Sequence, residues 1–65
     1  MSKSYRHGQI LKVIRGGRIF TQEELAQALG KLGLQTTQVT LSRDVRELRL
    51  VKTQEGYAET SPEEA

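Results

Sequence analysis

The chain has 65 residues and a formal net charge of +2 at pH 7, with 35% hydrophobic and 28% charged residues. This length allows one small domain with a thin core, and the composition is not that of a disordered segment. The sequence contains no cysteine, which excludes disulfides and thiolate metal sites, and no apolar run long enough to span a membrane. We therefore expect a soluble, cytoplasmic protein.

The charge is divided unevenly along the chain. All ten Lys and Arg lie within residues 1–52, whereas residues 53–65 carry only acidic charge. A basic body with an acidic tail favours an anionic partner for the body. A solvated surface ending in a charged linker would give the same balance, so charge alone does not decide between them.

The first predicted element is a helix over residues 4–15, SYRHGQILKVIR. Its apolar side chains gather on one face and consist of Ile10, Leu11, Val13 and Ile14. Ser4 is the predicted N-cap, since a serine hydroxyl accepts a hydrogen bond from a first-turn amide. Gly16 and Gly17 are expected to end the helix through the left-handed conformation that glycine tolerates. Residues 18–20 then suit a short strand.

The second predicted helix covers residues 21–33, TQEELAQALGKLG. Thr21 and Glu24 have the T-x-x-E spacing of a capping box, in which each side chain bonds the backbone amide of the other residue. Leu25, Leu29 and Leu32 repeat at i, i+4 and i+7. Gly33 is the predicted stop.

The third predicted helix covers residues 37–48, TQVTLSRDVREL, with Thr36 or Thr37 as its N-cap. Leu41, Val45 and Leu48 fall at i, i+4 and i+7, the spacing of a buried stripe. The second and third helices are joined by a few residues that include a glycine, which matches a helix-turn-helix.

The period changes after the third helix. Residues 49–60, RLVKTQEGYAET, indicate two short strands around a turn at residues 54–56, where Gly56 supplies a positive φ. Two strands are unstable alone, so we expect Tyr57 to pack them onto the helices. The order helix, short strand, helix, helix, strand, strand predicts an α+β fold, a winged helix-turn-helix with three helices and a small antiparallel β-wing.

The third helix carries a continuous patch opposite its buried stripe. At about 100° per residue, this outer-face patch consists of Gln38, Val39, Ser42, Arg43 and Arg46. In a DNA major groove, arginine pairs with guanine O6 and N7, glutamine with adenine N6 and N7, and an apolar side chain with the thymine methyl. Ordinary surface charges are the alternative, but the helix-turn-helix order and the basic body favour base contacts by these residues.

Residues that border the patch are predicted to bind DNA phosphates. Thr36 and Thr37 offer hydroxyls beside the free amides at the helix N-terminus. Arg49 and Lys52 follow the helix and offer positive charge. A solvated lysine is the alternative for Lys52.

Asp44 lies at the edge of the buried stripe, where we predict that it pairs with a basic residue or backbone amide of a neighbouring helix. Glu47 is expected to be a solvated flank. His7, the only histidine, is expected to be exposed on the first helix. A triad of Ser42, His7 and Asp44 is not predicted, because so small a chain offers little pocket. One histidine without cysteine does not predict a metal site, so we expect no catalytic or metal residues and no enzyme.

Three motifs carry a resemblance to a known family. They are TQEEL at residues 21–25, TQVTLSRDVREL at residues 37–48 and LVK at residues 50–52. They resemble the N-terminal domain of bacterial arginine repressors, in which the pattern is T-Q-x-x-L, a glycine-bounded turn, T-Q-A-T-V-S-R-D-I-x-E-L and L-V-K. The resemblance covers roughly residues 5–58. The chain departs from the pattern at Val39, where the family usually has alanine.

The resemblance implies that residues 1–59 form a DNA-binding domain that reads an A/T-rich palindromic operator controlling arginine biosynthesis and metabolism. It places Gln38, Ser42 and Arg43 at DNA-contacting positions. Residues 60–65 would begin an interdomain linker to a C-terminal domain that this chain lacks. In the full-length protein, that domain would bind L-arginine as co-repressor and form homotrimers or homohexamers, whereas this domain alone would be a monomer or a weak dimer on DNA.

Two other functions remain open from the residues. A winged-helix protein-interaction module would need an apolar outer face on the third helix, where this chain has only Val39. A non-specific nucleic-acid binder would rely on lysines, whereas glutamine, serine and arginine are types that read bases.

Overall fold

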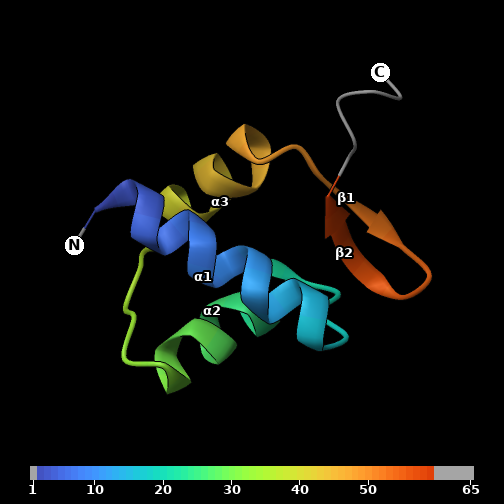
Figure 1. The fold of residues 1–65 in the computed structure, drawn as a ribbon, viewed down its shortest axis with the longest axis horizontal. Helices are drawn as coiled ribbons and strands as arrows, with labels where there is room; N and C mark the ends of the chain where they lie inside the picture. Colours follow the sequence, from blue (N-terminus) through green and yellow to red (C-terminus); the bar gives the residue numbers. More distant parts are fainter. Residues whose placement is uncertain (1, 60–65) are drawn as a thin grey trace.

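The computed structural model describes residues 2–59 and shows helices followed by an antiparallel hairpin (Figure 1). The elements are α1 (Lys3–Gly16), α2 (Gln22–Lys31), α3 (Gln38–Glu47), β1 (Leu50–Thr53) and β2 (Gly56–Glu59). This is the predicted α+β winged helix-turn-helix. The hairpin follows α3 and lies near the C-terminal end of α1, away from the N-terminus of the chain (Figure 1). The linker predicted at residues 60–65 lies outside the described residues.

The boundaries of α1 differ from the predicted ones at both ends. Ser2 is the N-cap in place of Ser4, and its Oγ accepts a hydrogen bond from the backbone amide of Tyr5 at 3.1 Å. Ser2 has the extended backbone that an N-cap needs, with φ −81° and ψ 153°. The predicted left-handed glycine end is also wrong. Gly16 belongs to the helix, and Gly17 is extended at φ −148°, so the chain leaves α1 without a left-handed turn.

Both predicted ends of α2 are confirmed by its hydrogen bonds. Thr21 Oγ1 accepts from the Glu24 amide at 3.0 Å, and Glu24 Oε1 accepts from the Thr21 amide at 3.2 Å, which completes the capping box. Beyond the other end, Gly33 has φ +84°. The Leu34 amide then bonds back to the carbonyl of Leu29 at 2.9 Å, as in a Schellman motif. Gly33 therefore acts as the stop.

Of the two predicted caps of α3, Thr37 is the one that the structure uses. Its Oγ1 accepts from the backbone amide three residues ahead at 3.1 Å. The predicted stripe faces the core, but only Leu41 in it is fully buried. Val45 and Leu48 are half-buried at the edge of the core, and the second buried residue of α3 is Asp44.

The core lies between the helices and one face of the hairpin. It consists of Ile10, Ile14, Leu25, Leu29, Leu34, Leu41 and Tyr57. Tyr57 is the contribution of the hairpin, as predicted, and is 8% exposed. Burial of a large apolar side chain is worth about 1.5–3 kcal/mol, so this ring holds the wing on the helices.

The connection at residues 18–20 is not the predicted strand, since the structure assigns no strand there. The carbonyl of Ile19 nevertheless accepts a hydrogen bond from the Tyr57 amide at 2.7 Å. The neighbouring Gly56 has the predicted positive φ, +109°. This hydrogen bond joins residues 18–20 to β2 but adds no third strand to the sheet. Within the described residues, the sheet consists of β1 and β2.

Candidate nucleic-acid interface

The outer-face patch forms one surface along α3. Gln38, Val39, Ser42, Arg43 and Arg46 together line an open hollow of about 330 Å³. Val39 is 62% exposed, and Gln38, Arg43 and Arg46 are exposed beside it. The structure therefore brings together all the side chains that the sequence predicted to face bases.

Arg43 and Arg46 give this patch its positive charge. Within the described residues, neither guanidinium takes part in an ion pair or hydrogen bond. A guanidinium offers donors in a fixed planar fork. Both arginines are thus available to a ligand that presents paired acceptors.

Ser42 is held in place by a residue of α2. Its Oγ donates a hydrogen bond to Gln22 Oε1 at 2.7 Å, and both residues are half-buried. Gln22 is the first residue of α2, so this bond joins the two helices of the helix-turn-helix. The sequence analysis missed Gln22, because the contact depends on how two helices cross and leaves no periodic signal in either one.

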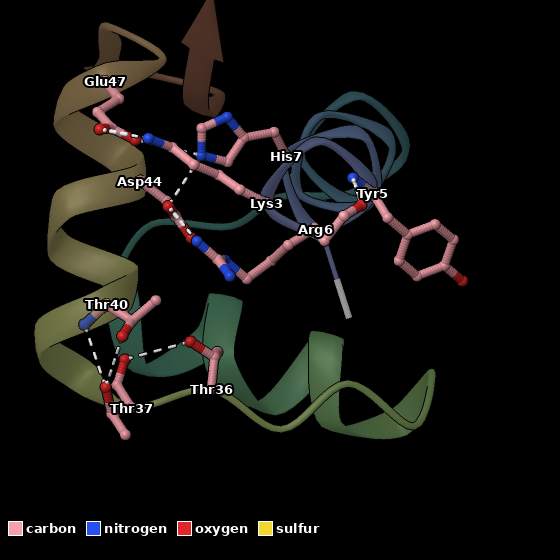
Figure 2. Close-up of polar contacts among 10 residues, drawn as sticks. Lys3, Tyr5, Arg6, His7, Thr36, Thr37, Thr40, Asp44 and Glu47 are labelled. Atoms are coloured by element: carbon pink, nitrogen blue, oxygen red, sulfur yellow. Dashed lines mark hydrogen bonds and ion pairs between the residues drawn. The ribbon is translucent and has the colours of Figure 1, made fainter.

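The predicted phosphate contacts lie around α3 rather than in a cluster. Thr36 and Thr37 precede the first turn of α3 (Figure 2), and Thr37 caps the helix. Thr36 Oγ1 donates a hydrogen bond to the Thr37 carbonyl at 3.4 Å. Arg49 follows α3 in a left-handed conformation at φ 56°, where the chain turns into β1. Lys52 lies on β1 opposite Tyr57, with its Nζ 5.8 Å from the centre of that ring.

A second hollow, of about 490 Å³, connects the patch to the wing. Its lining includes Gln22 of α2, Gln38 of α3 and Lys52 of β1. Gln38 also lines the hollow over the outer-face patch. The surface therefore continues from α3, past the start of α2, to the base of the wing.

Asp44 links α3 to α1 (Figure 2). The residue is 1% exposed. Its carboxylate accepts hydrogen bonds from Nε of Arg6 and, at 2.8 Å, from Nη2 of the same side chain. Burial alone would raise the pKa of Asp44, but the hydrogen bonds and charges of Arg6 and His7 outweigh it and hold the pKa below its ordinary value. The predicted pairing with a neighbouring helix is confirmed.

His7 belongs to the same cluster, so the expectation of an exposed histidine is wrong. Its side chain is 17% exposed, and its Nε2 lies 2.8 Å from Asp44 Oδ1 and 3.5 Å from Glu47 Oε1. Glu47 is exposed, as expected of a flank, but it also pairs with Lys3 at 2.8 Å. Periodicity within α3 does not show which α1 side chains reach it, which is why the sequence analysis missed these contacts.

The cluster links α1 to α3 through ion pairs. Ligand atoms of His7, Asp44 and Glu47 lie within 4.8 Å of one another, but Arg6 and Lys3 already pair with the two carboxylates. Ser42 bonds to Gln22 instead of His7, so no triad forms.

The comparison with known families decides what this surface belongs to. A family model described as "Arginine repressor, DNA binding domain" matches residues 1–60. The chain belongs to the arginine repressor family. The arginine repressor of Solibacter usitatus is 69% identical over 64 residues, which cover 98% of this chain and 44% of that protein.

Two further arginine repressors show the same partial coverage. That of Ruminiclostridium cellulolyticum is 53% identical over 57 residues, covering 85% of this chain and 38% of the relative. That of Clostridium botulinum is 52% identical over 50 residues, covering 77% of this chain and 33% of the relative. The chain thus spans less than half the length of the arginine repressors it matches.

Membership in the arginine repressor family confirms the resemblance drawn from the motifs. The matched region is the DNA-binding domain of a repressor, so the family is one of transcription regulators and not of enzymes. Among residues 2–59, no helix has the length and apolar character needed to cross a membrane.

Proposed function

We propose that this chain is the sequence-specific DNA-binding domain of an arginine-responsive transcriptional regulator, in which α3 reads the major groove of an A/T-rich palindromic operator. The observation that carries the proposal is the outer-face patch, which is exposed, continuous and made of side chains that match base edges. Membership in the arginine repressor family supports the link to arginine metabolism.

Base reading follows from the chemistry of the patch. Arg43 and Arg46 are free within the described residues to pair with guanine O6 and N7, and Gln38 suits adenine N6 and N7. Val39, exposed between them, suits a thymine methyl. Each good bidentate pair is worth about 1–3 kcal/mol of discrimination against the wrong base.

Phosphate contacts set the register of α3 in the groove. The N-terminus of α3, beside Thr36 and Thr37, offers backbone amides to a phosphate. Arg49 and Lys52 supply positive charge after the helix and at the base of the wing. Contacts of this kind add affinity without sequence preference.

The assembly around the domain is also part of the proposal. Residues 1–59 form the DNA-binding domain, and residues 60–65 begin a linker to a C-terminal domain. In the full-length cytoplasmic protein, that domain binds L-arginine as co-repressor and forms homotrimers or homohexamers. A palindrome then binds two copies of the domain at once, whereas the isolated domain binds weakly as a monomer or a weak dimer.

The base-reading role is tested by comparing Arg43→Ala with Lys52→Ala. We expect Arg43→Ala to weaken binding to an A/T-rich palindromic duplex by about 1–3 kcal/mol. The loss of binding free energy on a scrambled duplex of equal composition should be smaller. Lys52→Ala is the matched control for a phosphate contact and is expected to weaken both duplexes alike. Fluorescence anisotropy titrations at one fixed salt concentration measure both losses. Equal losses on the two duplexes for Arg43→Ala would rule out base reading by that side chain.

A further inference from the structure

The hydroxyl of Ser42 has a fixed direction in the helix-turn-helix. A serine hydroxyl carries one proton to donate and two lone pairs that accept. Here the proton goes to Gln22 Oε1, and the Oγ–Oε1 distance of 2.7 Å is optimal for such a bond. What remains for a ligand in front of α3 is the acceptor side of Ser42.

Gln22 is well placed to hold that direction. It lies between the two residues of the capping box, Thr21 and Glu24, so hydrogen bonds on both sides of it order the backbone that carries it. Gln22 and Ser42 are both half-buried, which protects their bond from competition by water. Gln22 lines the hollow between α3 and the wing, and Ser42 lines the hollow over the outer-face patch. Gln38 lines both hollows, so Gln22 and Ser42 lie inside the candidate interface.

In the major groove, a fixed acceptor distinguishes between bases. Adenine N6 and cytosine N4 are the amino groups that donate there, whereas guanine O6 and N7 and thymine O4 accept. A serine free to rotate donates to some bases and accepts from others, and selects little. A serine whose proton is already taken binds only the amino groups.

We propose that Gln22 is a positioning residue that turns Ser42 into a hydrogen-bond acceptor, so that Ser42 selects adenine or cytosine at one position of the site. This inference rests on the proposed function, because it requires α3 to lie in the major groove. It adds a specificity role for a residue of α2 that need not touch a base itself.

The test is a selection of bound duplexes from a pool with a randomised core, using the 65-residue chain and its variants. Ser42→Ala identifies the base pair that Ser42 reads, because preference is lost at that position. In the unmodified chain, we expect adenine or cytosine to be enriched there by about fivefold, the effect of one hydrogen bond. Gln22→Leu removes the acceptor for the Ser42 proton and is expected to flatten the preference at this position only.

Gln22→Glu is the matched control. A carboxylate still accepts the Ser42 proton but lacks the amide donors, so the same base preference should persist even where repulsion from phosphates lowers overall affinity. Gln22→Ala also removes the acceptor for the Ser42 proton and should flatten the same base preference. Because alanine is smaller than leucine, this variant keeps the test valid if leucine impairs folding. Circular dichroism establishes that each variant is folded before the selection.

The outcomes separate this inference from the function on which it rests. If the unmodified chain enriches no sequence at all, the proposed base reading fails. If it enriches a sequence but guanine or thymine is preferred at the Ser42 position, the acceptor role is overturned. The same conclusion follows if Gln22→Leu and Gln22→Ala leave the preference unchanged, or if Gln22→Glu abolishes it.

Discussion

Replacement of Gly56 by alanine is expected to destabilise the fold by about 2–4 kcal/mol, through backbone strain and a steric clash together. Gly56 has φ +109°, a conformation that L side chains rarely adopt. An added Cβ would lie 2.6 Å from the carbonyl oxygen of Ile19 and 3.0 Å from its nitrogen. Both are backbone atoms, so relief requires the wing to move away from the connection before α2 and to weaken the hydrogen bond between Tyr57 and Ile19.

Gly8→Ala is the matched control for this substitution. Gly8 lies inside α1, and nothing lies within 4 Å of its added Cβ. Alanine there should stabilise the chain by about 0.5–1 kcal/mol, because glycine is a poor residue inside a helix. Urea unfolding followed by circular dichroism measures both variants. A Gly56→Ala midpoint equal to that of the unmodified chain would show that the wing does not depend on this close approach.

Replacement of Asp44 by alanine is expected to destabilise the fold by about 3 kcal/mol, because it breaks a buried ion pair from one side. Asp44 is 1% exposed, and the side chains of Arg6 and His7 are 19% and 17% exposed. Without the carboxylate, these two α1 side chains lose their shared acceptor in a place that water reaches poorly. The same loss removes the buried part of the link between α1 and α3 (Figure 2), so DNA binding should fall as well.

Glu47→Ala tests whether burial causes the effect. Glu47 is one turn further along α3 and pairs with Lys3, but the two side chains are 45% and 59% exposed. An exposed pair of this kind contributes less than about 1 kcal/mol. Chemical unfolding at neutral pH compares the two variants. If Asp44→Ala costs no more than Glu47→Ala, the buried cluster does not anchor α3.

Features that depend on neighbours along the chain could be predicted from the sequence. The capping box of Thr21 and Glu24 requires only a spacing of three residues, and the stop at Gly33 requires only a residue that tolerates positive φ. The outer-face patch follows from the helical repeat once Leu41 is placed in the core. These rules gave the order of the helices and the wing, and the face of α3 that stays exposed.

Features that depend on how elements pack could not be predicted in the same way. The bond of Ser42 to Gln22 and the contact of His7 with Asp44 join different helices, and neither α2 nor α1 signals them in its own pattern. Asp44 itself was placed correctly, because a carboxylate at the edge of a buried stripe needs a partner. Which residues supply that partner depends on the crossing of α1 and α3.

The salt dependence of DNA-binding affinity tests most directly whether this domain reads sequence. The measurement is fluorescence anisotropy of the unmodified chain with an A/T-rich palindromic duplex and with a scrambled duplex of equal composition, over a series of salt concentrations. The proposal predicts tighter binding to the palindrome at every salt concentration, because base contacts persist when phosphate contacts are screened. Equal affinities that fall together as salt rises would contradict it and would leave phosphate contacts as the only interaction of α3 with DNA.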